Sequence, residues 1–568
     1  MRSGPASRLF DGPGDVDQPP IQRRLNGTSL GVTGPEIVEP KSSHTFQGQL
    51  FRDAPSEHVT SRSLSAERRA YDSNNVECTP FPWRMPSSEE PCLGYREVEY
   101  VDHAPTCIRT FERARKRGFR LGARESRRKT NPVHDSRADH DRSRERARRR
   151  FDSFIPFSDQ ERATDSVSHL FELQVARSPH AAALSTARGS TTYAQLGAQV
   201  NLVATTITAH SAQARKRIGI VMDNGEAMIA SVLGALKANV PFVPIDPTGA
   251  PTARAAYVLD DAEVGLVLTS RPHLSYARDA AGSRPIVDVE GLKDATFEEE
   301  LITRNDTPVG DVAWIIYTSG STGEPKGVVQ TRRNVVHFVT TEADAYGICP
   351  DDRMAVAFSS SVNFWYRETL SALVKGATIF PVKLNEVGFS GLERTLVDNR
   401  ITLVTLVPSL FRQFAPTLSS ALPDLRLLKV GGEPVLRSDF ELYREKLGKE
   451  CVFLNRFGTT ETAPVRYHFL DHDSQVSETY VPIGYPVSGS DITIMDVDGA
   501  EVPNGETGEI VVRSRYLALS YWQRPEITAA AFRPATERPS ERHYFTGDVG
   551  MKRPDECVVH LGRKDNQV

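Results

Sequence analysis

Short apolar segments alternate with amphipathic segments between residues 194 and 430, and this alternation restricts the fold more than any other feature of the sequence. The apolar segments have the length of strands and lack a polar face, which is typical of strands buried on both sides. Between them, residues 194–210 and 226–238 carry apolar residues at helical spacing. Strands and helices in this order predict parallel sheets with helices on both faces. The strand-like segments are residues 217–222, 242–246, 264–268, 312–317, 401–407 and 425–430.

The chain falls into three regions of different character. Residues 1–150 are dominated by proline, glycine, serine and charged residues with little apolar periodicity, which predicts disorder. Residues 165–480 carry the alternating pattern, whereas residues 481–568 contain shorter strand-like segments separated by turns. The predicted fold class is therefore α/β, with two parallel-sheet subdomains, helices on both faces and a smaller β-rich subdomain, preceded by a disordered N-terminal region.

A basic tract ends the first region. Residues 109–150 contain 17 Lys and Arg against 6 Asp and Glu. Such a tract can bind nucleic acid, dock on an acidic partner or remain a solvated tail, and the start codon can also have been assigned too far upstream. Few aromatic residues interleave the arginines, so no platform for base stacking is present. We therefore do not expect nucleic acid as a partner.

The cysteine spacing, the absence of long apolar stretches and the character of the first residues indicate where in the cell the protein is located. Six scattered cysteines without metal-type or CxxC spacing favour a reducing environment. No apolar stretch approaches the roughly 20 residues that a membrane-spanning helix needs. The first residues have no apolar core of a secretion signal. These features predict a cytoplasmic protein without a membrane partner.

Residues 318–327, Thr-Ser-Gly-Ser-Thr-Gly-Glu-Pro-Lys-Gly, follow the strand-like segment 312–317 and are suited to holding a polyphosphate. Glycines allow close approach of the backbone, and successive N–H groups form a nest for anions. The hydroxyl groups and Lys326 add donors and a positive charge. The spacing differs from the Walker motif. Without further context, the segment could also be a flexible surface turn.

Further segments, in order, give the chain a resemblance to the adenylate-forming (AMP-binding) superfamily. That superfamily includes acyl-CoA synthetases, luciferases and the adenylation domains of nonribosomal peptide synthetases. The resemblance runs from about residue 165 to the last residue, and residues 171–179 are closest to the peptide synthetases, which make secondary metabolites. The other matching segments are residues 192–196, 236–246, 318–327, 455–461, 508–512, 520–525, 544–548 and 562–568.

The resemblance implies a ligase that uses ATP and Mg²⁺. Lys326, Thr460 and Glu461 would be catalytic, and Glu461 would hold the metal. Phe457 would stack on adenine, while Asp548 and Arg563 would bind the ribose. Taken singly, Glu461 could start a helix and Asp548 could be a turn residue. The full implied ATP-binding set is Thr318, Ser319, Gly320, Ser321, Thr322, Gly323, Lys326, Gly327, Phe457, Thr460, Asp548 and Arg563.

The same resemblance places the acid substrate next to Asn363. Amino-acid-activating relatives carry an aspartate there, which pairs with the substrate ammonium. Asparagine loses that ion pair but can bond to a hydroxyl or an amide. Arg367 and Arg456 could pair with a second carboxylate of the substrate; alternatively, Arg367 is a surface residue and Arg456 binds an internal acid. The implied pocket residues are Asn363, Phe364, Arg367, Val430, Arg456 and Pro464.

The sequence given ends at Val568, just after Asp565, the residue that resembles the family's hinge. Family members continue into a C-terminal subdomain that carries a catalytic lysine. The sequence alone therefore predicts retained ATP binding, weak adenylation and no thioester formation, as for a fragment, one half of a split gene or a pseudogene product. The expected partners are a small carboxylic acid and a carrier protein or separate C-terminal subdomain. An acyl- or aryl-CoA synthetase and a catalytically impaired nucleotide-binding protein remain alternatives.

Overall fold

The computed structural model describes residues 135–564, apart from residues 149–152, 164–165, 211, 213–216, 295–311, 320–323 and 537. Most of the predicted disordered region, residues 1–134, lies outside this part of the chain. The same holds for Gly320, Ser321, Thr322, Gly323, the side chain of Ser319 and the predicted hinge residue Asp565.

The first large sheet contains seven strands in the order β18-β8-β7-β4-β3-β5-β6. Its central strands are parallel, as the continuous apolar segments predict, and β8 and β18 add an antiparallel edge. Its strands are β3 (Ile218–Val221), β4 (Phe242–Ile245), β5 (Leu266–Thr269), β6 (Ile286–Asp288), β7 (Val312–Ser319), β8 (Pro325–Thr331) and β18 (Ser520–Tyr521).

The second large sheet contains nine strands in the order β15-β14-β13-β12-β11-β9-β10-β1-β2. The strands from β13 to β1 are parallel to one another, whereas β2, β14 and β15 are antiparallel to their neighbours. Its strands are β1 (Ala182–Thr186), β2 (Gly189–Thr192), β9 (Arg353–Val356), β10 (Thr378–Pro381), β11 (Leu403–Leu406), β12 (Leu427–Gly431), β13 (Val452–Thr459), β14 (Ala463–Leu470) and β15 (Tyr485–Pro486).

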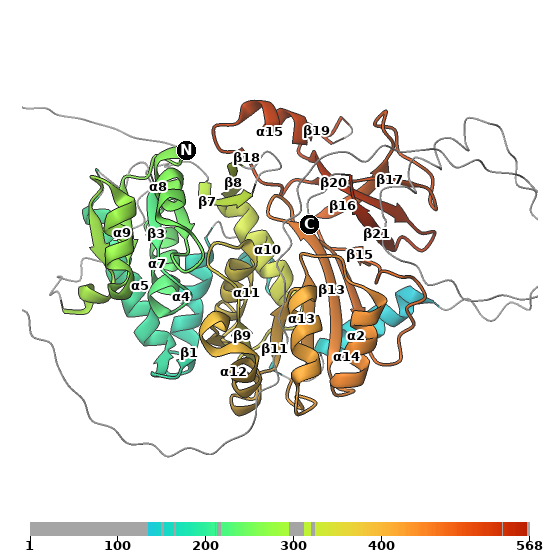
Figure 1. The fold of residues 1–568 in the computed structure, drawn as a ribbon, viewed down its shortest axis with the longest axis horizontal. Helices are drawn as coiled ribbons and strands as arrows, with labels where there is room; N and C mark the ends of the chain where they lie inside the picture. Colours follow the sequence, from blue (N-terminus) through green and yellow to red (C-terminus); the bar gives the residue numbers. More distant parts are fainter. Residues whose placement is uncertain are drawn as a thin grey trace, which may run out of the picture. The chain divides into compact units, whose positions relative to one another are not determined.

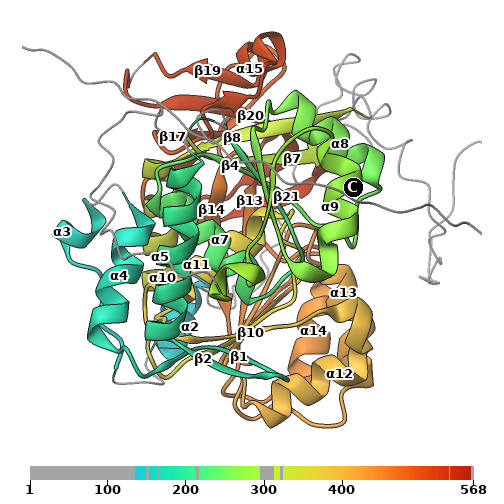
Figure 2. The same cartoon turned by 90° about the vertical axis from the view of Figure 1, so that its left-hand side faces the viewer.

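Helices cover both faces of the two large sheets, which confirms the predicted α/β class (Figures 1 and 2). One hydrophobic cluster joins the inner faces of both sheets through α4 (Val167–Arg177), α5 (Tyr193–Ala209), α7 (Glu226–Lys237), α10 (Arg332–Ala345) and α11 (Asn363–Leu373). The outer face of the first sheet packs on α8 (Thr252–Asp261) and α9 (Leu274–Ala281). The outer face of the second packs on α12 (Leu384–Asp398), α13 (Pro408–Phe414) and α14 (Arg437–Lys446).

A third, antiparallel sheet follows near the end of the described chain. It has the order β16-β17-β20-β19, and β21 also pairs with β20. Strand β18 leaves this region and adds to the edge of the first large sheet by pairing with β8. The elements are β16 (Ser490–Met495), β17 (Thr507–Ser514), α15 (Pro525–Ala531), β19 (Phe532–Pro534), β20 (Arg542–Lys552) and β21 (Val558–Arg563).

The prediction of disorder over residues 1–150 is wrong for one segment, because Ser136–Arg148 forms helix α2. The helix packs on β14 and β13 and buries His140 against His468, Phe469 and Tyr485. The sequence pattern does not indicate this helix, because it is rich in arginine and has few apolar residues, so its buried face is largely polar.

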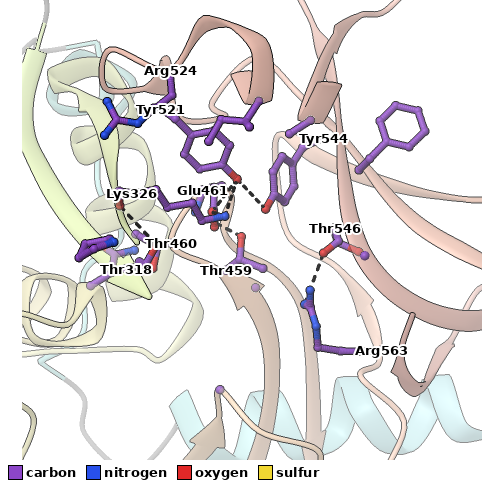
Figure 3. Close-up of a pocket in the computed structure, with 18 of the residues that line it drawn as sticks. Thr318, Lys326, Thr459, Thr460, Glu461, Tyr521, Arg524, Tyr544, Thr546 and Arg563 are labelled. Carbon is purple, nitrogen blue, oxygen red and sulfur yellow. Dashed lines mark hydrogen bonds and ion pairs between the residues drawn. The ribbon is translucent and has the colours of Figure 1, made fainter. Parts of the chain in front are cut away.

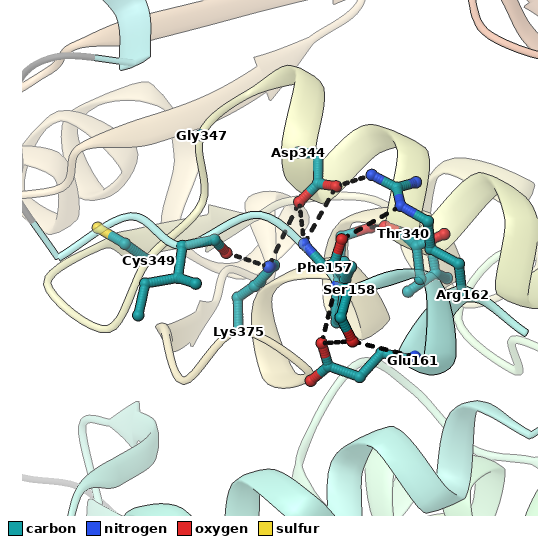
Figure 4. A network of polar contacts seen from close by, with 12 residues as sticks. Phe157, Ser158, Glu161, Arg162, Thr340, Asp344, Gly347, Cys349 and Lys375 are labelled. Carbon is teal, nitrogen blue, oxygen red and sulfur yellow. Dashed lines mark hydrogen bonds and ion pairs between the residues drawn. The ribbon is translucent and has the colours of Figure 1, made fainter. Parts of the chain in front are cut away.

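The next segment, residues 153–163, is fastened to α10 through Asp344 (Figure 4). The carboxylate of Asp344 accepts a hydrogen bond of 3.2 Å from the backbone N–H of Phe157 and pairs with Arg162 and with Lys375. Burial lowers the pKa of Lys375, and Asp344 opposes that effect. None of the helices in residues 135–564 that the structure describes is long and apolar enough to span a membrane.

Candidate active site

A cavity of about 780 Å³ opens where elements of all three sheets meet. Its wall comes from the β7–β8 hairpin, the N-terminus of α11, the turn between β13 and β14, Tyr521 of β18, α15, β20 and the end of β21 (Figure 3). Both large sheets therefore contribute residues to the cavity wall. Eight residues implied by the family resemblance line it, namely Thr318, Lys326, Asn363, Phe364, Arg367, Thr460, Glu461 and Arg563.

Lys326 and Glu461 face one another in this cavity (Figure 3). Lys326 lies on β8 rather than in the preceding loop, and its Nζ is 3.5 Å from Oε1 of Glu461. Tyr521 joins the pair, since it donates a hydrogen bond of 2.9 Å to Glu461 and lies 3.1 Å from the Lys326 Nζ. Burial and the Glu461 carboxylate raise the pKa of Tyr521. A cation, a carboxylate and a neutral hydroxyl are thus held together on one wall.

The tight turn between β13 and β14 presents Thr460 and Glu461. Gly458 cannot carry a side chain, because a Cβ there would lie 2.1 Å from the carbonyl oxygen of Ala463. Ala463 itself has a φ of 56°, which few non-glycine residues adopt. Gln330 fastens the turn to β8 by donating to the carbonyl oxygen of Thr460 at 2.7 Å. Glu461 therefore lies in a hairpin turn, and the alternative that it starts a helix is wrong.

Asp548 and Arg563 lie side by side on the antiparallel strands β20 and β21. Asp548 is 5% exposed, and its Oδ1 lies 3.1 Å from Nε2 of His560 and 3.4 Å from NH1 of Arg563. The His560 ring also contacts Phe457, with centroids 5.6 Å apart. Asp548 and Phe457 do not line the cavity, whereas Arg563 does. The ribose and adenine roles of these residues stay predictions.

Asn363 is the first residue of α11 and lines the cavity. Asn363 is 5% exposed, and among the residues that the structure describes neither its amide nitrogen nor its amide oxygen has a hydrogen-bond partner. Phe364 lies beside it, and its ring is 4.3 Å from the guanidinium carbon of Arg456. Gly432 makes room for that ring, because a Cβ there would lie 3.0 Å from it.

Behind Phe364 lies a buried cluster of five charged side chains. Arg367 pairs with Glu342, while Arg456 and Lys429 both pair with Glu368. Arg456 therefore binds an internal acid, and Arg367, at 2% exposed, is no surface residue. Burial raises the pKa of Glu342 and lowers that of Lys429; the cations counter burial at Glu368 and hold its pKa at about 2.

Besides Asp548 and Phe457, four predicted site residues do not line the cavity. Val430 is fully buried in the hydrophobic cluster of α12, α13 and α14. Pro464 lines a separate, small cavity beside Glu342. Arg456 lies behind Phe364 rather than on the cavity wall, and Gly327, on β8, does not line the cavity either. Of the implied substrate-pocket residues, Asn363, Phe364 and Arg367 line the cavity, and their contact with a substrate stays a prediction.

Several residues of the site are not evident from the sequence. Tyr521 lies in a segment that resembles a family motif, but the motif alone gives the residue no role. The hydroxyl oxygen of Tyr544 lies 3.4 Å from that of Tyr521. The sequence also does not show that Glu342 and Glu368 form ion pairs with the arginines. The two glutamates are buried residues of α10 and α11, respectively. An acidic residue within an otherwise apolar helix face was the available signal for such internal ion pairs.

Comparison with known proteins agrees with this geometry. The AMP-binding enzyme family matches residues 171–522, which cover more than half of the chain. The chain belongs to the AMP-binding enzyme family.

The proteins that the chain resembles include synthetases of peptide antibiotics and a nonribosomal peptide synthetase of known structure. Tyrocidine synthase 1 of Brevibacillus parabrevis is 28% identical over 404 residues, which cover 71% of this chain but 36% of that protein. A crystal structure of the nonribosomal peptide synthetase FmoA3 superposes with a TM-score of 0.65 at 27% identity, covering 76% of this chain and 44% of the other. The N-terminal subdomain of Klebsiella oxytoca NpsA shares the fold, with a TM-score of 0.62 at 21% identity, covering 72% of this chain and 100% of that subdomain. The chain thus spans about a third of the length of tyrocidine synthase 1.

Proposed function

We propose that the protein activates a small carboxylic acid with ATP, as the adenylation domain of a nonribosomal peptide synthetase does. A carboxylate oxygen attacks the α-phosphate of ATP, the bond from that phosphorus to the pyrophosphate oxygen breaks, and acyl-AMP and pyrophosphate form. Both reactants are anions, so neutralising charge and fixing the two groups in line supply most of the catalysis.

One observation carries this proposal. A single cavity holds a cation next to a carboxylate, Lys326 and Glu461, and also the buried amide of Asn363, which has no partner within the described part of the chain. The first pair suits a polyphosphate and its metal ion, and the amide suits a small polar substrate. A volume of about 780 Å³ is within the usual range for a site that takes a ligand of nucleotide size.

The residues present fit ATP. Lys326 supplies a mobile positive charge, and Thr318 and Thr460 supply hydroxyl groups on the same wall. A crystal structure of FmoA3 in an AMPPNP-bound form matches this chain with a TM-score of 0.64 at 25% identity, which supports nucleotide binding at this fold. We assign Lys326 to the phosphates and Arg563, with Asp548 behind it, to the ribose.

Glu461 also fits Mg²⁺, which commonly binds one or two carboxylates together with substrate phosphates. Within the described residues, no group of three His, Cys, Asp or Glu side chains forms a ready-made metal cage. The ion would neutralise charge on the phosphates, and Tyr521 would hold the Glu461 carboxylate in place.

The acceptor of the acyl group follows from the relatives. Because they are peptide synthetases, we propose a carrier protein as the partner rather than coenzyme A. We further propose that residues 165–480 form the nucleotide-binding core, that residues 481–568 complete it, and that the protein is cytoplasmic.

The test is carboxylate-dependent exchange of labelled pyrophosphate into ATP, with pooled amino, hydroxy, oxo, aryl and dicarboxylic acids. The assay is run on the chain alone and with the C-terminal subdomain of a relative added. Exchange that requires one pool supports acid activation. Lys326→Ala should abolish this exchange, whereas the control variant Lys552→Ala, at a residue that does not line the cavity, should retain it. Absence of exchange under both conditions, with no ATP binding by calorimetry, would overturn the proposal.

A further inference from the structure

We propose that Arg524 is a second phosphate-binding cation of this site and that it contacts the terminal phosphates of ATP, which leave as pyrophosphate. This inference rests on the proposed function and adds a residue to the same reaction. It follows from the place of Arg524 on the cavity wall, from the contacts that hold it there and from the charges around the β7–β8 hairpin.

Arg524 lies on the same side of the cavity as the β7–β8 hairpin. It lines the cavity together with Thr318, Glu324 and Lys326, which belong to that hairpin. Figure 3 shows Arg524 and Lys326 on the left of the cavity and Arg563 on the right. Because we assign the ribose to Arg563, the triphosphate extends from there toward the hairpin. Its terminal phosphates are then the part of the nucleotide nearest to Arg524.

Asp261, the last residue of α8, fixes the direction of the Arg524 side chain. NH2 of Arg524 donates a hydrogen bond of 3.2 Å to Oδ1 of Asp261, and the Tyr317 hydroxyl of β7 donates to Oδ2 of the same carboxylate. The indole N–H of Trp522 donates to the carbonyl oxygen of Asp261 at 2.8 Å. The backbone N–H of Trp522 donates to the carbonyl oxygen of Gly327, on β8, at 2.7 Å. The segment that carries Arg524 is thus tied to both strands of the hairpin.

The guanidinium of Arg524 can bind a ligand while it keeps this anchor. The side chain is 33% exposed. Its hydrogen bonds, to Asp261, to the Tyr257 hydroxyl and to the carbonyl oxygen of Gln523, use at most three of the five N–H donors that a guanidinium carries. A planar guanidinium can donate to two phosphate oxygens at once, whereas a lysine supplies a single point charge. Arg524 therefore adds a geometry that Lys326 lacks.

The charges around the hairpin give Arg524 a reason to be there. On this side of the cavity, the two cations Lys326 and Arg524 face three carboxylates, those of Glu324, Glu461 and Asp261. Removal of Arg524 would leave one cation against three carboxylates, and a triphosphate adds further negative charge. Arg524 therefore supplies compensation that Lys326 cannot supply alone. The other charged residues that the structure describes on the wall pair elsewhere: Glu509 with Lys564, Arg563 with Asp548 and Arg367 with Glu342.

The experiment separates the terminal phosphates from the rest of the nucleotide. The wild-type protein, Arg524→Ala and Arg524→Lys are titrated by calorimetry with ATP, AMP and inorganic pyrophosphate in the presence of Mg²⁺. The KM for pyrophosphate is measured by exchange, with the C-terminal subdomain of a relative added. Arg524→Ala should raise the Kd for ATP and the KM for pyrophosphate about tenfold and the Kd for AMP by less than about twofold. Arg524→Lys should lie between, because it keeps the charge and loses the paired donors.

Arg538→Ala is the matched control, because Arg538 also forms an exposed ion pair, with Glu541, but does not line the cavity. It should bind ATP and pyrophosphate as the wild type does, and the thermal midpoint without ligand should be the same in all variants. Unchanged binding of ATP and pyrophosphate by Arg524→Ala, or equal losses for ATP and AMP, would overturn the inference and leave the proposed function intact. A wild-type protein that neither binds ATP nor exchanges pyrophosphate would overturn both.

Discussion

Arg426 donates a hydrogen bond of 2.7 Å to the carbonyl oxygen of Ala147, 279 residues earlier in the chain. The same guanidinium, 1% exposed, pairs with Asp352 at 2.7 Å and donates to the carbonyl oxygens of Tyr346 and Gly347. The last turn of α2 is thus fixed to the loop before β9. The helix that lies outside the match to the family is held by the core of the protein.

Arg426→Ala should destabilise the protein by about 3–5 kcal/mol, because it leaves Asp352 buried without its partner. Unfolding in urea would measure the change. The matched control is Arg400→Ala, since Arg400 pairs with Asp424 at the surface and is 76% exposed in its side chain. That variant should lose no more than about 1 kcal/mol. Equal losses of unfolding free energy in the two variants would mean that the buried Arg426–Asp352 pair stabilises the protein no more than the surface pair does.

Gly458→Ala should lower both stability and activity, because the added Cβ would collide with the backbone at Ala463 and displace Glu461. We expect a loss of about 1–3 kcal/mol in unfolding free energy and at least a tenfold loss of pyrophosphate exchange. Gly249→Ala is the control, because a Cβ at Gly249 meets no atom of the described residues within 4 Å. A fully active Gly458→Ala variant would show that the turn can relax.

Lys326→Ala should weaken ATP binding by tenfold or more while leaving thermal stability without ligand close to that of the wild type. Lys326 is on the cavity wall and its removal leaves Glu461 bonded to Tyr521, so the fold keeps its contacts. Calorimetric titration with ATP in the presence of Mg²⁺ measures the effect. A variant that binds ATP as tightly as the wild type would refute the assignment of Lys326 to the phosphates.

Stability should fall as the pH is lowered below about 6.5, because α2 buries a neutral histidine. Burial, with the nearby His468 and arginines, lowers the pKa of His140 from 6.5 to about 2, and burial lowers that of His468 to about 4. The unfolded chain therefore binds protons in this range and the folded chain does not, so stability rises with pH up to 6.5. Each such histidine contributes about 1.4 kcal/mol per pH unit below that point.

The comparison of wild-type protein with His140→Gln measures this effect. Glutamine keeps an acceptor for the backbone N–H of Phe469, which bonds to His140 Nδ1 at 3.2 Å, but it does not titrate. Urea unfolding at pH 7 and pH 5 should show a smaller loss in the variant, by about 1–2 kcal/mol. Equal losses of stability in the wild type and the variant would mean that His140 takes up its proton as readily in the folded protein as in the unfolded chain.

Much of the α/β architecture was predictable because its strands are apolar without interruption. The segments at residues 217–222, 242–246 and 312–317 became β3, β4 and β7 within two residues at either end. Antiparallel β8 was not predicted, because Pro325, Lys326 and Gly327 are typical of a loop and become a strand only through pairing with β7.

The candidate site was predictable only in part, for a physical reason. Motifs locate residues such as Lys326 and Asn363 along the chain, but not the side chains that meet them in space. The buried charges around Arg456 depend on contacts between α10, α11, β12 and β13, which no local pattern encodes. Helix α2 was missed for a similar reason, because its partners lie on β14 and β15.

Strand β18 has a consequence for how the site is assembled during folding. It brings Tyr521 to Lys326 across 195 residues, and it pairs with β8 through only Ser520 and Tyr521. Contacts of such long range form late, since closing the intervening chain costs entropy. A folding intermediate in which β3 to β8 have already paired, but β18 has not, would therefore still lack the Tyr521 hydroxyl that bonds to Glu461. Nucleotide binding should therefore begin only after β18 has paired with β8, and a bound nucleotide should slow the dissociation of β18 from β8.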